Sequence, residues 1–132
     1  MEFIPRVIGP HQVLLVNGEI DLYNVGDFKK NLFNIIARDI KSLIIDMNGI
    51  TYMDSSGIGA LVAGQKKMKL KRGKYGLLNI QEDVYNVLKL ATLDRFFTIY
   101  KTEAEIPREI SAPIVAVRRP PMRGFRRPIF RK

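Results

Sequence analysis

The segment Met53-Asp54-Ser55-Ser56-Gly57-Ile58-Gly59 decides how this chain of 132 residues folds and functions. An apolar, β-branched run precedes it, and a helical pattern that extends to about residue 71 begins within it. A serine at a helix start can cap free backbone N–H groups through its hydroxyl. The same N–H groups, together with the helix dipole, favour an anion. We therefore expect a helix that opens at Ser55, with the serine hydroxyl exposed.

The two glycines of this segment are unfavourable helix residues, because each costs roughly 1 kcal/mol relative to alanine. Gly57 and Gly59 lie two positions apart, so they face different sides of the helix. We expect one of them to allow close packing on the sheet. The other would leave the backbone open to a partner.

Strand and helix patterns alternate along the rest of the chain, with turns expected at Gly9-Pro10, Gly18 and Asn48-Gly49. Alternation of this kind predicts crossover connections and parallel strands, with one antiparallel hairpin at the start. The predicted fold is α/β, with a mixed, largely parallel sheet of four to five strands and about four helices. We expect strands at 2–8, 12–17, 42–47, 75–80 and 96–100, and helices at 24–37, 55–71, 82–91 and 102–109.

Local details of this pattern give further expectations. Pro5 indicates that the first strand is irregular or lies at a sheet edge, and Asn24 is a plausible N-cap. Asp21 follows the second strand and Asp46 lies towards the end of the third, so both could meet Asp54 at one edge of the sheet. A plainer interpretation remains open, in which Ser55 is only a cap, Asp54 a loop acid and Asp21 a turn acid.

The net charge of +9 is concentrated at the C-terminus. Residues 112–132 carry seven basic residues and no acid, which leaves +2 for residues 1–111. The chain therefore divides into a domain at 1–111 and a Pro/Arg-rich tail at 112–132, whose composition is typical of disorder. The tail, which includes Phe125 and Phe130, could bind nucleic acid or an anionic surface, or could dock a partner.

Several functional classes are excluded or disfavoured by composition. The chain has no cysteine and one histidine, which excludes disulfides, thiolate zinc sites and multi-histidine metal sites. We predict no cofactor. A hydrolase using Ser55 would need a base, and the single histidine, His11, is expected at an exposed turn, so we predict no enzyme. No apolar run is long enough for a membrane helix, no signal peptide is evident, and the lack of cysteine fits a cytoplasmic protein.

Three stretches carry a more specific resemblance. Residues 50–61, Ile-Thr-Tyr-Met-Asp-Ser-Ser-Gly-Ile-Gly-Ala-Leu, resemble the signature of STAS-domain anti-anti-sigma factors, also called anti-sigma factor antagonists. Residues 18–21, Gly-Glu-Ile-Asp, resemble the second landmark of that family, and residues 84–93 resemble its apolar helix and leucine turn. The resemblance covers about residues 3–106, with the landmarks in order.

This resemblance implies a phosphorylation switch at Ser55, which matches the phosphoacceptor of the family. The unphosphorylated protein would bind an anti-sigma factor that is itself an ATP-using serine kinase, and would thereby release a sigma factor and regulate transcription. Phosphorylation would abolish binding, and a PP2C-type phosphatase would reverse it. The resemblance further implies that the surroundings of this serine bind the partner: Asp21, Asp54, Ser56, Gly57 and Gly59. An alternative within the family is a scaffold or regulatory subunit of a stress-signalling or transport-associated complex.

Overall fold

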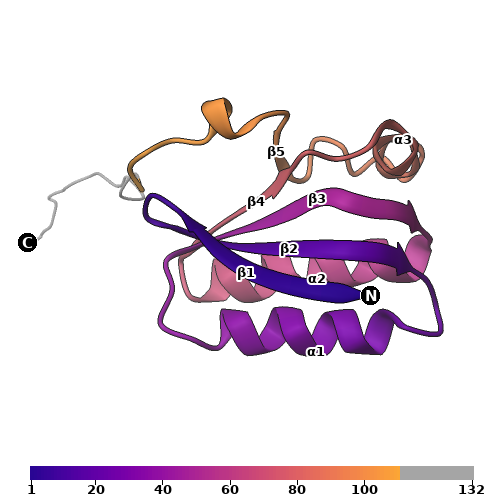
Figure 1. Ribbon diagram of the computed structural model, residues 1–132, viewed down its shortest axis with the longest axis horizontal. Helices are drawn as coiled ribbons and strands as arrows, with labels where there is room; N and C mark the ends of the chain where they lie inside the picture. Colours follow the sequence, from indigo (N-terminus) through magenta and orange to yellow (C-terminus); the bar gives the residue numbers. More distant parts are fainter. Residues whose placement is uncertain (111–132) are drawn as a thin grey trace, which may run out of the picture.

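A computed structural model describes residues 1–110 of the chain (Figure 1). The tail expected at 112–132 lies outside the described residues. The elements in chain order are β1 (Glu2–Ile8), β2 (His11–Ile20), α1 (Val25–Ile36), β3 (Ser42–Met53), α2 (Ser55–Leu70), β4 (Lys74–Leu78), α3 (Glu82–Leu90), β5 (Thr98–Tyr100) and the 3-10 turn η1 (Glu103–Glu105).

The five strands form one sheet in the order β1-β2-β3-β4-β5. Strand β1 runs antiparallel to β2, and the pairs from β2 to β5 are parallel, which confirms the predicted mixed, largely parallel sheet. Pro5 lies on the edge strand β1, as expected. A proline is tolerated on an edge strand because its lack of a backbone N–H breaks no hydrogen bond inside the sheet. The helix predicted at 102–109 is only the short η1, because Pro107 cannot continue a helix.

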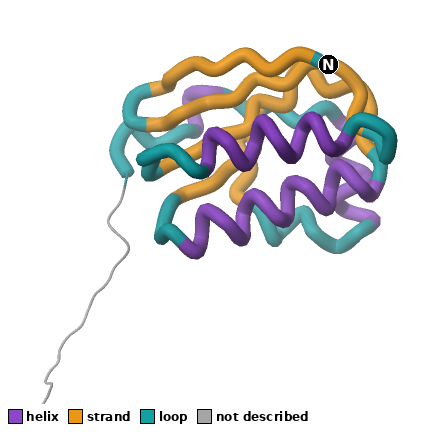
Figure 2. The backbone as a smooth tube through the Cα atoms, turned by 90° about the horizontal axis from the view of Figure 1, so that it is seen from below, coloured by secondary structure: helices purple, strands orange, loops and turns teal. Residues whose placement is uncertain are grey.

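Helices α1 and α2 lie side by side against one face of the sheet (Figure 2), and α3 lies near the ends of β3 and β4 (Figure 1). The main core fills the space between the helices and the sheet, and its largest members are fully buried: Phe28, Leu32, Leu43, Ile45, Met47, Leu61 and Leu77. β3 is the middle strand of the sheet, and α2 begins two residues after it ends. The first turn of α2 therefore lies at the middle of one end of the sheet.

Strands β2 and β3 are longer than predicted. The expected turns at Gly18 and Asn48-Gly49 lie inside these strands, which pair out to Ile20 and Met53 through two shifts of register. Gly49 permits this pairing, because a Cβ there would lie 1.6 Å from the Asn17 side-chain oxygen. Because both strands extend this far, β2 and β3 end together at the start of α2. The loop that contains Asp21 therefore lies beside Asp54.

The other face of the sheet is covered by the segment after β5. Ile106 packs there with Ile8, Val13, Ile44 and Leu78 in a second apolar cluster. The segment therefore closes the face that α1 and α2 leave open.

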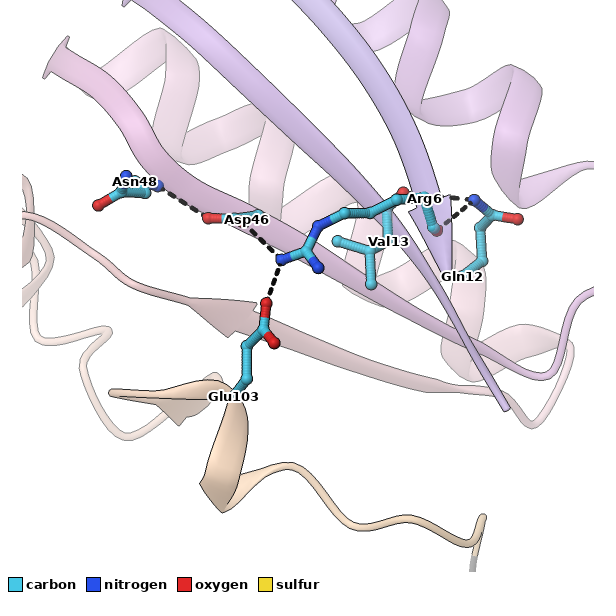
Figure 3. A network of polar contacts seen from close by, with 6 residues as sticks. All are labelled: Arg6, Gln12, Val13, Asp46, Asn48 and Glu103. Atoms are coloured by element: carbon cyan, nitrogen blue, oxygen red, sulfur yellow. Dashed lines mark hydrogen bonds and ion pairs between the residues drawn. The ribbon is translucent and has the colours of Figure 1, made fainter. Parts of the chain in front are cut away.

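A polar network joins the same segment to the sheet (Figure 3). Arg6 donates to the Asp46 carboxylate at 3.1 Å and to Glu103 of η1 at 2.5 Å. Asp46 is buried and also accepts the backbone N–H of Asn48 at 3.0 Å. The expectation that Asp46 meets Asp54 at one edge of the sheet is therefore wrong, because Asp46 lies seven residues, about 23 Å, before the end of β3 and is held by Arg6.

His11 is buried rather than exposed, which corrects the expectation of a surface turn residue. Only 4% of its surface is accessible. One ring nitrogen lies 2.6 Å from the Ser42 hydroxyl and the other 2.6 Å from the carbonyl oxygen of Pro107. His11 thus fastens the C-terminal segment to the start of β2 and β3.

Candidate functional site

The first turn of α2 is capped by Asp54 and not, as expected, by Ser55. The Asp54 carboxylate accepts the backbone N–H groups of Ser56 at 2.9 Å and of Gly57 at 3.4 Å. It also accepts the hydroxyl of Ser56. Because an aspartate at the N-cap position already satisfies these donors, Ser55 is not needed for capping.

The pKa of Asp54 lies below its ordinary value. The Ser56 hydroxyl that donates to the carboxylate is the main cause, and the backbone N–H groups of Ser56, Gly57 and Leu22 act in the same direction. Each of these donors stabilises the charged form of the carboxylate. Asp54 is therefore a fixed negative charge beside Ser55 at neutral pH.

This lowered pKa predicts a pH-dependent contribution to stability. A group whose pKa is lower in the folded state stabilises the fold above its unfolded value, about 3.9, and loses that contribution as the pH falls. We expect Asp54→Ala to have a lower free energy of unfolding in urea than the native chain at pH 7. This difference in free energy should become smaller below about pH 4. Asp27→Ala, which removes an exposed first-turn acid of α1, is the control and should show a smaller gap at pH 7. Equal urea midpoints for the native and Asp54→Ala proteins at pH 7 would contradict the claim that the Asp54 cap stabilises the fold.

Ser55 itself lies exposed at the first position of α2. Among residues 1–110 its hydroxyl has no hydrogen-bond partner, whereas the Ser56 hydroxyl is held by Asp54. The two adjacent serines therefore differ: Ser55 is accessible and uncommitted, and Ser56 is half-buried and engaged.

The loop between β2 and α1 is fixed beside this helix start. The Asp21 carboxylate accepts the backbone N–H groups of Tyr23 at 2.9 Å and of Asn24 at 3.0 Å. In the opposite direction, the backbone N–H of Asp21 donates to the side-chain oxygen of Asn24 at 2.9 Å. Asn24 thus braces the loop instead of capping α1 as expected. The loop is tied to the site because Leu22 N–H donates to Asp54 at 3.1 Å and Asp54 N–H to the carbonyl of Ile20 at 3.2 Å.

Two apolar side chains of this loop were not singled out from the sequence. Leu22 is 70% exposed and Tyr23 is 95% exposed. A signal was present, since a leucine and a tyrosine stand between the loop acid and the following helix where polar residues usually form turns. They add exposed apolar area to the loop that Leu22 ties to Asp54.

The two glycines of the segment lie on opposite sides of α2. Gly57 is buried, and a Cβ there would lie 2.6 Å from Met53 Cγ and 2.9 Å from Ile20 Cγ2. Gly59 is exposed, and a Cβ there would meet nothing within 4 Å. Gly57 therefore permits close contact with the sheet, and Gly59 leaves a flat surface one helical turn from Ser55.

Serine hydrolysis is disfavoured by the same geometry. His11 begins β2, whereas Ser55 follows the end of the parallel strand β3, so the two lie at opposite ends of the sheet, about 30 Å apart. The histidine nitrogens are also engaged by Ser42 and Pro107. The one histidine cannot act as the base for Ser55. None of the helices within residues 1–110 has both the length and the apolar character needed to cross a membrane.

Comparison with known proteins agrees with this architecture. The sequence profile of the STAS domain matches residues 2–106. The anti-sigma-B factor antagonist of Listeria monocytogenes is 26% identical over 96 residues, which cover 73% of this chain and 84% of the relative. A provisionally named anti-sigma factor antagonist from Thermotoga maritima has a crystal structure that matches with a TM-score of 0.72 at 27% identity, over 78% of this chain and 89% of that one.

A further solved structure shows the fold alone. The Bacillus cell fate determinant SpoIIAA in its phosphorylated form matches with a TM-score of 0.59 at 21% identity, over 78% of this chain and 95% of that one. Because the profile match at residues 2–106 spans most of the sequence, this chain belongs to the STAS-domain family, with anti-sigma factor antagonists at about 26% identity among its relatives.

Proposed function

We propose that this protein is an anti-sigma factor antagonist switched by phosphorylation of Ser55. In its unphosphorylated form it binds an anti-sigma factor that is also a serine kinase, and so releases a sigma factor. Phosphorylation ends this binding, and a phosphatase of the PP2C type restores it. The observation that carries the proposal is the exposed hydroxyl of Ser55, which has no hydrogen-bond partner within residues 1–110 and lies beside an aspartate that already caps the helix.

Asp54 caps α2 and Ser55 does not, which supports a switch that leaves the fold intact. A phosphate on Ser55 would displace no hydrogen bond of the described structure, because the cap is made by Asp54. A negative charge at a helix N-terminus is favourable by about 0.3–1 kcal/mol when exposed. The repulsion from Asp54 acts against this gain. The main effect of phosphorylation therefore falls on whatever covers Ser55.

The surface around Ser55 supports a protein partner. Leu22 and Tyr23 offer exposed apolar contacts on one side, and Gly59 offers an open helix surface on the other. A phosphoserine carries about −1.5 to −2 charges at pH 7 and would join Asp54 within this surface. Adding that charge to an interface that has closed over Ser55 introduces both bulk and a desolvation cost.

The test is phosphorylation by the cognate kinase, followed by mass spectrometry. The purified chain is incubated with its candidate anti-sigma factor and ATP, and the phosphopeptides are mapped. We expect one phosphate on Ser55, none on Ser55→Ala, and normal modification of Ser56→Ala, which removes the neighbouring engaged hydroxyl. A phosphate that persists in Ser55→Ala would refute the assignment.

A further inference from the structure

A hollow of about 670 Å³ lies beside β5, at the edge of the sheet. Strand β5 is the last in the sheet order, so one of its sides faces no other strand of the sheet. The hollow is lined by residues of α3, of β5 and of the segments next to them. None of its lining residues belongs to α2 or to the loop between β2 and α1, so this surface is separate from the one at Ser55.

Two neighbouring residues of β5 place the hollow at the open side of that strand. Ile99 packs against the main core, whereas Tyr100 packs against the second cluster on the other face of the sheet. Successive side chains of a strand point to opposite faces. Because Ile99 and Tyr100 both line the hollow, it runs across the outer side of β5.

The backbone of Ile99 faces this outer side. Asn79 N–H donates to the carbonyl oxygen of Tyr100 at 3.1 Å, so the backbone groups of Tyr100 are directed towards the chain of β4. Backbone groups of successive residues in a strand point to alternate sides, so the N–H and C=O of Ile99 point away from β4. The open side of β5 therefore offers a donor and an acceptor to a further strand.

Carboxylates outnumber cations in the lining of the hollow. It contains the acids Glu82, Asp94 and Glu105 and one cation, Lys101. Glu105 has a structural role, because it accepts the backbone N–H of Lys101 at 2.9 Å. Within residues 1–110, Glu82 and Asp94 form neither an ion pair nor a side-chain hydrogen bond. Since residues 1–111 carry a net charge of +2, the hollow is a local excess of negative charge.

Aromatic side chains lie among these acids. Tyr85 is half-buried and Phe97 is buried, and both line the hollow. The ammonium group of Lys89 lies 5.8 Å from the centre of the Tyr85 ring, so this ring already attracts a cation. Arginine and lysine side chains combine an apolar stem with a cationic head. The hollow is complementary to both parts.

We propose that the open side of β5 binds an extended, arginine- or lysine-bearing segment of a partner protein by strand addition. In this mode the main chain of the peptide pairs with a sheet edge, and its side chains enter neighbouring pockets. The Ile99 backbone would pair with the peptide, and cationic side chains of the peptide would reach Glu82 and Asp94. The inference is independent of the proposed switch at Ser55.

A nuclear magnetic resonance titration of the isotope-labelled full chain tests the proposal. The probe is the peptide Arg-Val-Arg-Val-Arg-Val, acetylated and amidated at its ends. We expect shifts of the amides in residues 97–101 and in α3, and slower hydrogen exchange of the Ile99 amide. The same peptide with methylated backbone nitrogens cannot donate to the sheet and should bind about two- to tenfold more weakly. Glu-Val-Glu-Val-Glu-Val should cause no such shifts.

Matched variants test the role of the carboxylates. Glu82→Gln/Asp94→Asn removes the two uncommitted acids of the hollow and should weaken peptide binding by about two- to 30-fold. The control Asp39→Asn/Asp83→Asn removes two exposed charges outside the lining, one of them the adjacent first-turn acid of α3, and should bind almost as the native chain does. The dispersion of the amide spectrum shows that each variant is folded.

Four results would overturn the inference. Equal weakening in both double variants would mean that net charge alone explains binding. Native affinity of the methylated peptide would exclude pairing with the backbone of β5. Shifts confined to another surface, or no shifts at millimolar peptide, would exclude the hollow as the site. Self-association of the full chain that Glu82→Gln/Asp94→Asn abolishes would show that a second copy of this chain occupies the hollow instead.

Discussion

Ser55→Asp should remain folded and lose its anti-sigma factor. The substitution places a permanent carboxylate at the exposed first position of α2, beside the Asp54 carboxylate, without removing any hydrogen bond of the described structure. A loss of about 2–4 kcal/mol of binding free energy corresponds to about 30- to 1,000-fold weaker binding. Calorimetric titration against the purified partner measures this loss, and the urea midpoint of the variant should stay near that of the native chain.

Two controls separate the local effect from charge in general. Asn34→Asp adds one negative charge at an exposed position of α1, and it should bind the partner as the native chain does. Ser55→Ala should also bind normally, but should no longer respond to ATP. The proposed switch is refuted if Ser55→Asp unfolds, because the hydroxyl would then have a structural role. It is also refuted if Ser55→Asp binds with native affinity, because the partner would then not cover this serine.

The order of the elements could be predicted because hydrophobic period is a property of neighbouring residues. The helices at Val25–Ile36 and Glu82–Leu90 begin and end within one residue of the expected bounds. The bounds of β3 could not be predicted, because Asn48-Gly49 has the composition of a turn. Its role depends on Asn17 from another strand, whose side chain occupies the space that Gly49 leaves open. A contact between distant segments decided the structure there.

Some features of the candidate site could likewise be predicted from the local sequence, and others could not. The exposed serine at a helix start and the opposite sides of Gly57 and Gly59 follow from helix geometry, so the sequence was sufficient for them. The cap was assigned to the wrong residue, because a serine and an aspartate are equally good N-caps and only the start of α2 separates them. Asp46 was misplaced because its distance from Ser55 depends on how far β3 extends.

The buried histidine shows the limit of single-residue reasoning. His11 follows Gly9-Pro10, where polar residues usually face solvent. It is buried because the chain returns after β5 and places the carbonyl oxygen of Pro107 over it, 96 residues later. No local pattern records that return. The same return of the chain also brings Glu103 to Arg6.

Gly57→Val should destabilise the protein strongly, whereas Gly59→Ala should stabilise it slightly. The Cβ of any residue at 57 would lie 2.6 Å from Met53 Cγ and 2.9 Å from Ile20 Cγ2, and both neighbours are buried with little room to move. Overpacking of this kind costs about 3 kcal/mol or more for a branched side chain, and valine regains little helix propensity. At Gly59 the space is open, so alanine should add about 0.4–1 kcal/mol to the free energy of unfolding.

Urea unfolding of the two variants measures these opposite effects, and partner binding adds a second readout that separates structure from function. Gly59→Ala should bind as well as the native chain, because one methyl group barely raises the surface. Gly59→Arg should stay folded yet bind poorly, because its long side chain would stand one turn from Ser55, where a partner must approach closely enough to transfer a phosphate. Native affinity in Gly59→Arg would place the partner elsewhere on α2. A native midpoint for Gly57→Val would mean that the start of α2 can move away from Met53 and Ile20, and Ser55 would then have no fixed position on which a switch could depend.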